Sequence, residues 1–272
     1  MLIAHLSDLH VRVAGDDYMG QVDTGAALAA AVADIRARDP APDLVILGGD
    51  LVDTPSAAEY VRLAEILAPL RQPVFAIPGN HDSRDGLTAA LAGRGWRTEL
   101  DGFIQYAVED WPVRLLFLDT VLPGRVEGEL CDARLDWLER TLARAPDRPT
   151  VVVMHHPPFE VGIAYMDRWN LRRGADRLAA ILRANPQVER LLCGHVHRSA
   201  QLRWAGTLAV VAPSTAHQIN LDLRGEPPMA YRLEPPGYLL HALLPGTGLV
   251  THLVPLGEFG PARAFRDGSP VA

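Results

Sequence analysis

The chain has 272 residues, of which 48% are hydrophobic and 22% are charged, so it resembles an ordinary globular protein with enough apolar residues for a sizeable core. Its formal net charge is -7, and no run of Lys or Arg exceeds two residues. This balance excludes the basic stripe that grips a nucleic-acid backbone, so we expect no polymeric nucleic acid as a partner.

The start of the chain and its two cysteines bear on where the protein works. The first ten residues, MLIAHLSDLH, predict a strand that runs into a polar loop, without the basic and apolar regions of a signal peptide. No later segment has the roughly 18 uninterrupted apolar residues of a membrane span. Cys131 and Cys193 lie far apart, which favours a reducing compartment and buried thiols. We therefore expect a cytoplasmic protein with no membrane span.

Up to about residue 198, short apolar runs alternate with stretches of helical period that are rich in Ala and Leu. This alternation is typical of an α/β fold with a largely buried sheet. Strands are predicted over residues 2–6, 44–47, 74–77, 115–118, 151–154 and 189–193, helices over 26–38, 57–70, 132–144 and 175–183, and a hairpin over 103–118.

After residue 198 the pattern changes to alternating runs such as LRWAGTLAVV, YLLHALL and LVTHLV, separated by Gly and Pro. These runs predict antiparallel strands and a second sheet. His241 and His252 lie in them, and we expect both at the surface or at an interface. We expect one domain over residues 1–256, and from residue 257 the low apolar content predicts a loosely held tail.

Residues able to bind metal ions follow five of the six predicted strands of the α/β region. Because ligands of open α/β sheets bind beyond the carboxyl ends of the strands, clusters far apart in sequence can converge in one pocket. The clusters are Asp8 with His10, Gly49 with Asp50, Asn80 with His81, His155 with His156, and His195 with His197.

The residue types in these clusters constrain the metal. Imidazole nitrogens mixed with carboxylate and amide oxygens suit Mn, Fe, Zn or Co better than Ca. Seven such side chains are more than one ion needs, but they can serve two divalent ions about 3.5 to 4 Å apart if one carboxylate, most naturally Asp50, bridges them. We expect the glycines before Asp50, Asn80 and His195 to make tight turns that aim these side chains at the ions.

The blocks Asp-x-His, Gly-Asp, Gly-Asn-His-Asp, His and Gly-His-x-His stand here in order over residues 8–197. In this the chain resembles the calcineurin-like metallophosphoesterase superfamily. It is most similar to the subgroup of class III cyclic-nucleotide phosphodiesterases and bacterial glycerophosphodiesterases. MHHPPF, the Met166-Asp167 segment and Ala216-His217-Gln218 extend the resemblance to the glycerophosphodiesterase branch. The absence of Asp-Arg-Gly after Asp50 argues against a Ser/Thr protein phosphatase.

The resemblance implies a four-layer αββα sandwich with two mixed β-sheets and the metal site at the carboxyl ends of the strands. It also implies hydrolysis of small phosphodiesters, either 3′,5′-cyclic nucleotides such as cAMP or glycerophosphodiesters, by attack of a metal-bridging hydroxide, and a homo-oligomer that is a dimer or larger. One metal would be held by Asp8, His10 and His197, the other by Asn80, His155 and His195, and both by Asp50. His81 would be catalytic together with Asp50 and Asn80, and Asn80, His81 and His217 would contact the substrate.

Each cluster alone has an ordinary structural interpretation, such as a helix cap or a Gly-Asp turn. Their coincidence in one order is what favours a metal site. We interpret His5 as a satisfied core histidine and His156 as a residue that packs or hydrogen-bonds beside the ligand His155, while His217 is balanced between a loop residue and a substrate contact. Two other functions stay open, which are a phosphomonoesterase of the same superfamily and a non-catalytic scaffold with this fold.

Overall fold

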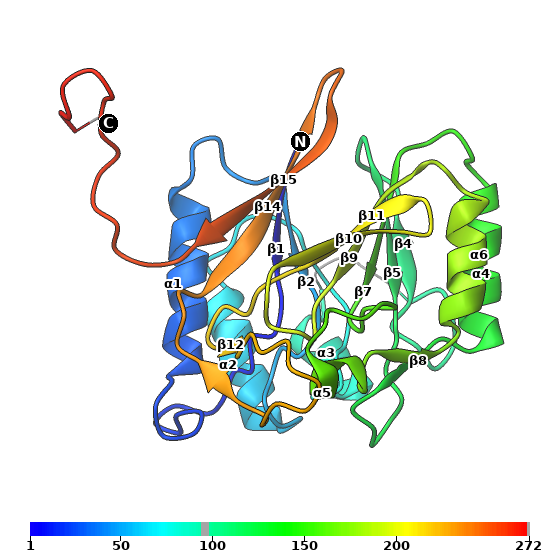
Figure 1. Cartoon of the computed structure of the whole chain (residues 1–272), viewed down its shortest axis with the longest axis horizontal. Coiled ribbons are helices and arrows are strands. Elements are labelled where there is room, and N and C mark those ends of the chain that lie inside the picture. The colour runs from blue at the N-terminus through cyan, green and yellow to red at the C-terminus, as the bar shows by residue number, and fades with distance from the viewer. Residues whose placement is uncertain (94–97, 271–272) are drawn as a thin grey trace.

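The architecture is built around two β-sheets that pack face to face, with helices on the outside of each (Figure 1). The computed structural model describes residues 1–93 and 98–270. The helices are α1 (Thr24–Ala37), α2 (Ala57–Leu67), α3 (Arg84–Ala90), α4 (Asp132–Ala143), α5 (Ala164–Asp167) and α6 (Ala175–Arg183). Figure 1 shows α1 and α2 on one side of the sheets and α4 and α6 on the opposite side.

The first sheet has the strand order β15-β14-β1-β2-β3, and the second has the order β10-β11-β9-β7-β5-β4. Both sheets are mixed, because β1-β2-β3 and β5-β7-β9-β11 run parallel while β14, β15, β4 and β10 pair antiparallel. The strands of the first sheet are β1 (Leu2–Leu6), β2 (Leu44–Leu47), β3 (Val74–Ala76), β14 (Gly237–Leu244) and β15 (Gly248–Pro255). Those of the second are β4 (Tyr106–Val108), β5 (Arg114–Leu118), β7 (Thr150–Met154), β9 (Val188–Cys193), β10 (Ala200–Trp204) and β11 (Thr207–Val211).

Alternating side chains of the second sheet face two different cores. In β7, Val151 and Val153 belong to the core shared with the first sheet, whereas Val152 and Met154 face the core under α4 and α6. Both faces of the strand are covered, so it reads as a continuous apolar run. This layering confirms the predicted αββα sandwich.

Most predicted elements of the α/β region agree with the structure within a few residues. The starts of α1 and α2 follow from their caps, because the side chains of Asp23 and Ser56 accept hydrogen bonds from the backbone N–H groups of Ala26 and Glu59. The short helices α3 and α5 were not predicted. Ser83 caps α3 in the same way, but Gly86 within this short helix weakens its helical pattern.

The late strands pair antiparallel with one another, as predicted, and the fold has a second sheet, but the late strands do not form that sheet by themselves. The hairpin β14-β15 joins the first sheet beside β1, and β10 and β11 extend the second sheet beyond β9. As a consequence His241 is fully buried rather than at the surface, since β14 is an inner strand between β1 and β15. His252 lies on the edge strand β15 and is exposed, as expected.

Two smaller sheets complete the fold, β12 (Gln218–Ile219) with β13 (Tyr231–Arg232) and β6 (Gly128–Glu129) with β8 (Leu171–Arg173). Beyond Pro255 the described chain contains no helix or strand, and Figure 1 shows this segment running outward from the body. Both cysteines are free, with Cys193 buried and Cys131 only partly so. Over the described ranges, no helix combines the length and the apolar character needed to span a membrane.

Candidate metal centre

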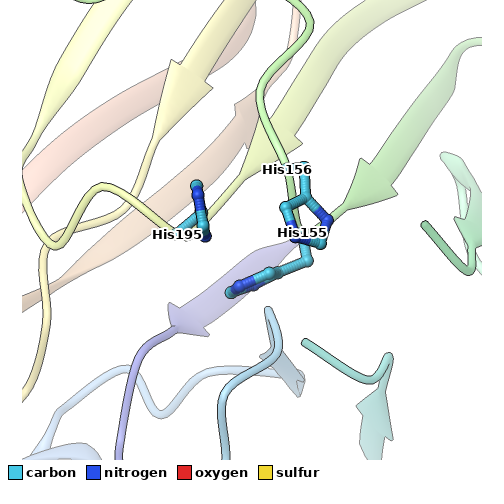
Figure 2. Close-up of side chains that lie close together, drawn as sticks. All are labelled: His155, His156 and His195. Carbon is cyan, nitrogen blue, oxygen red and sulfur yellow. The ribbon is translucent and has the colours of Figure 1, made fainter. Parts of the chain in front are cut away.

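The five predicted clusters meet at one end of the two sheets. Asp8 and His10 follow β1, Asp50 follows β2 and Asn80 follows β3, all in the first sheet, while the remaining two clusters follow β7 and β9 of the second sheet. Figure 2 shows His155 and His156 on the loop after β7 and His195 on the neighbouring loop after β9. The site is therefore assembled from both sheets, at their carboxyl ends.

The backbone of these loops is strained at the predicted ligands. Seven non-glycine residues of the described chain have a positive φ, and five of them are predicted ligands. These five are Asp8, His10, Asp50, His195 and His197, with φ values of 55°, 45°, 52°, 72° and 56°. Such conformations cost of the order of 1 to 3 kcal/mol each and cluster at functional sites. The fold therefore tolerates strain to direct these side chains inward.

The glycines in the loops serve close packing more than turning. A Cβ atom on Gly79 would lie 2.2 Å from Asp50 Oδ1, and one on Gly49 would lie 2.5 Å from His155 Nδ1. Gly49 also has a φ of 97°, but Gly79 has no positive φ. The expected tight turn therefore explains Gly49, whereas Gly79 is required because the Asp50 carboxylate lies against its backbone.

Asp8, His10 and His197 form the first group of possible ligands. His10 Nδ1 lies 3.3 Å from Asp53 Oδ1, and His197 Nδ1 lies 3.1 Å from the carbonyl oxygen of His217. Both of these oxygens accept hydrogen bonds, so each Nδ1 carries the proton and each Nε2 presents a lone pair. The two Nε2 atoms face each other at 3.0 Å.

Facing lone pairs repel unless a proton or a cation lies between them. Two nitrogens bound to one ion at about 2.1 Å and about a right angle lie about 3.0 Å apart. Asp8 Oδ1 is 3.5 Å from His197 Nε2, so a carboxylate oxygen is close to the same point. The group fits a divalent cation by its donor atoms and by its geometry.

The second group has the same logic. His155 donates through Nδ1 to the carbonyl oxygen of Gly48 at 2.7 Å, and its Nε2 lies 3.3 Å from Asp50 Oδ2, where either a proton or a cation would compensate the carboxylate. The amide oxygen of Asn80 lies 3.1 Å from His195 Nδ1. His155 and His195 face each other edge to face, with ring centroids 5.3 Å apart. The imidazole and amide groups predicted for the second ion are therefore brought together.

Asp50 lies between the two groups. Its Oδ2 is 3.3 Å from His155 Nε2 and 3.8 Å from His10 Nε2, and its Oδ1 accepts a hydrogen bond from the backbone N–H of His81. Burial alone would raise the pKa of this carboxyl, but His155, His81 and His10 hold the pKa of Asp50 well below its usual range. An ionised carboxylate with one oxygen near both groups is in the position expected of a bridging ligand.

The carboxylates also set the charge of the histidines. Burial lowers the pKa of His155, but Asp50, Asp8 and the backbone of Gly48 together outweigh burial and raise that pKa to about 9. Burial and the neighbouring His155 lower the pKa of His195 to about 3. Burial and His10 likewise lower the pKa of His197 well below its usual range. Without an ion, His155 therefore holds a proton beside Asp50, while His195 and His197 are neutral and can present lone pairs to a cation.

His156 is close to this group but is not a free ligand. Its Nδ1 is hydrogen-bonded to the hydroxyl of Thr120 at 2.7 Å, and its Nε2 donates to the carbonyl oxygen of Val126 at 2.9 Å. Both ring nitrogens are therefore engaged, as the sequence interpretation expected. His5 is fully buried but only half satisfied, because its Nδ1 is 3.5 Å from His241 Nε2 while its Nε2 has no hydrogen-bond partner among the described residues.

His81 lies at the mouth of the centre, with 40% of its side chain exposed. Its Nδ1 donates to the carbonyl oxygen of Asp53 at 2.7 Å, which leaves Nε2 as the reactive nitrogen of the ring. Its centroid is 4.6 Å from that of His10. The ring is thus fixed beside the first group and remains accessible.

Asp53 was not identified from the sequence, although it ends the Gly-Asp-Leu-Val-Asp segment that also supplies Asp50. Its carboxylate contacts His10 Nδ1 and is paired with Arg12, and its carbonyl oxygen holds His81. Burial opposes ionisation, but the hydrogen bond and charge of His10 lower the pKa of Asp53. This residue therefore orients a predicted ligand and the predicted catalytic histidine together.

Tyr18 was also missed, because it lies in a loop with no recognisable motif. Its ring stacks on His217 with centroids 4.2 Å apart and an interplanar angle of 13°. His217 is 1% exposed, and burial together with His10 lowers its pKa to about 3. Both residues line a cavity of about 170 Å³ that also contains Asp50, Asn80 and His81. A neutral His217 thus lies at the wall of the centre rather than in an outer loop.

The comparisons with known proteins agree with this geometry. Residues 1–199 match the model of the calcineurin-like phosphoesterase family. The chain belongs to the calcineurin-like phosphoesterase family. It is 37% identical over 98% of its length to a probable glycerophosphodiester phosphodiesterase GpdQ of Arcobacter nitrofigilis, covering 98% of that protein.

Another relative is named for a different phosphodiester substrate. The chain is 35% identical over 80% of its length to the 3′,5′-cyclic adenosine monophosphate phosphodiesterase CpdA of Escherichia coli, covering 77% of it. Its fold resembles that of a dimetal phosphatase from Danio rerio, with a TM-score of 0.66, 14% identity and coverage of 94% and 99% of the two chains. At that identity the likeness supports the fold alone.

Proposed function

We propose that this member of the calcineurin-like phosphoesterase family is a binuclear metal-dependent phosphodiesterase that hydrolyses small phosphodiesters. The observation that carries the proposal is the convergence of buried imidazole and carboxylate groups from both sheets around Asp50, with His10 Nε2 and His197 Nε2 3.0 Å apart and His155 Nε2 3.3 Å from Asp50 Oδ2. Such a cluster of buried donor atoms suits two divalent cations. A non-catalytic scaffold has no need of it.

In this proposal Asp8, His10 and His197 hold one divalent ion, Asn80, His155 and His195 hold the other, and Asp50 contacts both. Imidazole with carboxylate and amide oxygen suits Mn, Fe, Zn or Co. When bound, two such ions supply an activated water and positive charge that offsets the charge of the phosphate in the transition state.

The other residues of the centre act on the substrate directly. His81 has Nδ1 fixed by Asp53, so its Nε2 is oriented to donate a proton to the leaving oxygen or to hydrogen-bond the phosphate. Proton donation of this kind typically contributes about 10²- to 10⁴-fold to the rate. The amide of Asn80 lines the same cavity as His81, next to the position proposed for the phosphate. The neutral His217 forms part of the cavity wall that contacts the substrate.

Glycerophosphodiesters are one candidate class of substrate, supported by a relative named for them that is 37% identical to the chain. Cyclic nucleotides are the second candidate, supported by the relatives named for cyclic AMP. We also propose that the protein works in the cytoplasm as a homo-oligomer, for which the exposed side chains of Leu221, Leu223 and Met229 offer apolar surface. Size-exclusion chromatography with light scattering would show a monomer if this assembly is wrong.

The test of the main proposal compares bis(p-nitrophenyl) phosphate with p-nitrophenyl phosphate, using protein reconstituted with Mn²⁺ and a chelated control. We expect turnover that the chelator abolishes and a higher kcat/KM for the diester. A higher kcat/KM for the monoester would indicate a phosphomonoesterase, and turnover of neither compound together with no stoichiometric Mn²⁺ binding would indicate a scaffold.

A further inference from the structure

Two cavities meet at Asn80 and His81. The inner cavity is the one of about 170 Å³ at the metal centre, and its outer wall carries the apolar side chains of Val126, Met166 and Trp169. A second, larger cavity of about 590 Å³ shares these two residues, and its lining combines polar and charged side chains with apolar residues such as Pro55 and Val121. Its lining includes Thr54, Ser83, Arg84, Asp85 and Pro123.

We propose that this outer cavity is the binding site for the second, hydrophilic ester arm of an acyclic phosphodiester, and that it favours a cationic or neutral arm over an anionic one. The inference rests on the proposed function, because it places the phosphate beside Asn80 and His81 at the inner end.

The sizes of the two cavities support this division. Small-molecule sites usually have volumes of about 300 to 1,000 Å³, a range that includes the outer cavity and lies above the inner one. The inner cavity contains the predicted ligands, so the phosphate and one small arm fill it. A diester carries two arms on one phosphorus atom, and the second arm must leave past His81, where the outer cavity begins.

The charged residues that line the outer cavity determine which charge on the ester arm is favoured. Asp53 is paired with Arg12 and His10, and Arg84 is paired with the buried carboxylate of Asp119 at 2.7 Å. These pairs leave little net charge.

The other two acids of the lining differ from each other. Asp82 is buried and accepts hydrogen bonds from the backbone N–H groups of Gly79 and Leu51. Asp85 is exposed, and its carboxylate has no hydrogen bond or ion pair with any described residue. Asp85 is therefore the charged residue of the lining that is both unpaired and accessible to a substrate.

The side chains that line the two cavities also indicate which ester arm each cavity binds. Both cavities have mixed linings, but Trp169 and Met166 of the inner cavity can pack against an aromatic group, and Thr54, Ser83 and Asp85 of the outer cavity can hydrogen-bond hydroxyl or ammonium groups. A p-nitrophenyl diester with a variable second arm should therefore present that arm to the outer cavity.

The experiment uses Mn²⁺-reconstituted protein and three diesters that share a p-nitrophenyl arm. Their second arms are choline, 2-hydroxyethyl and 2-carboxyethyl, which are cationic, neutral and anionic. For the unmodified protein we expect the highest kcat/KM with choline and the lowest with carboxyethyl. In Asp85→Lys the ratio of choline to carboxyethyl kcat/KM should fall about tenfold, since both the substrate and the residue reverse charge at a solvent-screened site. Asp85→Asn should give a smaller fall.

The matched control is Asp176→Lys. Asp176 is also an exposed acid in the first turn of a helix, but α6 lies on the outer face of the second sheet. An unchanged ratio in both Asp85 variants, or an equal change in Asp176→Lys, would overturn the inference while diester hydrolysis stands. Failure of the unmodified protein to hydrolyse any of the three diesters would instead overturn the proposed function.

Discussion

Asp53 offers a sharp test of how the centre is organised, because its side chain and its backbone serve different partners. The carboxylate contacts His10 Nδ1 at 3.3 Å, whereas the carbonyl oxygen holds His81 Nδ1 at 2.7 Å. Asp53→Asn removes the charge that orients His10 and increases its basicity, and it leaves the backbone carbonyl in place. The variant therefore separates support of His10, a proposed metal ligand, from support of His81, the proposed catalytic histidine.

The expected loss follows from the carboxylate–histidine–metal arrangement. Removing such a partner typically weakens metal binding about 10- to 100-fold, which corresponds to about 1.4 to 2.7 kcal/mol. One effect opposes the loss, because Asp53 also raises the pKa of His10 and so favours a competing proton. Measurements at about pH 8 reduce this competition, and a net weakening of about tenfold or more is expected there.

The assay is a competition titration in which the protein and a chromophoric chelator compete for Mn²⁺. Asp16→Asn is the matched control, because Asp16 also pairs with Arg12 but does not contact His10. We expect Asp16→Asn to bind both ions as the unmodified protein does. If the unmodified protein, Asp53→Asn and Asp16→Asn all bind the more weakly held Mn²⁺ with equal affinity, the role given to Asp53 is refuted.

Three further predictions concern Asn80, His81 and His5. Asn80→Ala should lose one of two Mn²⁺ equivalents and turn over more slowly, so full metal content with a normal rate would contradict its assignment. His81→Ala should keep both equivalents while kcat falls about 10²- to 10⁴-fold, and loss of an ion would identify it as a ligand instead. Burial lowers the pKa of His5 from its ordinary value of about 6.5 to about 3, so the unfolded chain binds a proton below pH 6.5 that the folded protein excludes. Stability is therefore complete above pH 6.5 and falls as the pH approaches 3. Between pH 6.5 and 4.5 the metal-free protein should lose about 2 to 3 kcal/mol from this group, and urea unfolding of His5→Gln should show a correspondingly flatter pH dependence.

The local elements and the chemical character of the predicted centre can be inferred from the amino-acid sequence alone. Buried parallel strands such as Leu44–Leu47 are short apolar runs whatever their neighbours, so they can be recognised without knowledge of the sheet. The metal-binding residue types follow directly after those strands, and the carboxyl ends of parallel strands meet at one edge. That is why the seven predicted ligands could be placed together before their distances were known.

The tertiary structure decided which strands pair and what supports the ligands. An alternating run shows that a strand has two faces, but its partner is chosen by contacts distant in sequence, so nothing local indicated that β14 lies beside β1 and buries His241. The partners that orient the ligands were hidden for the same reason. Tyr18 stacks on His217, which is far away in sequence, and Asp53 contacts His10 from the loop after a neighbouring strand, β2. The outer cavity with Asp85 likewise exists only where loops from separate elements meet, because a cavity is a property of packing.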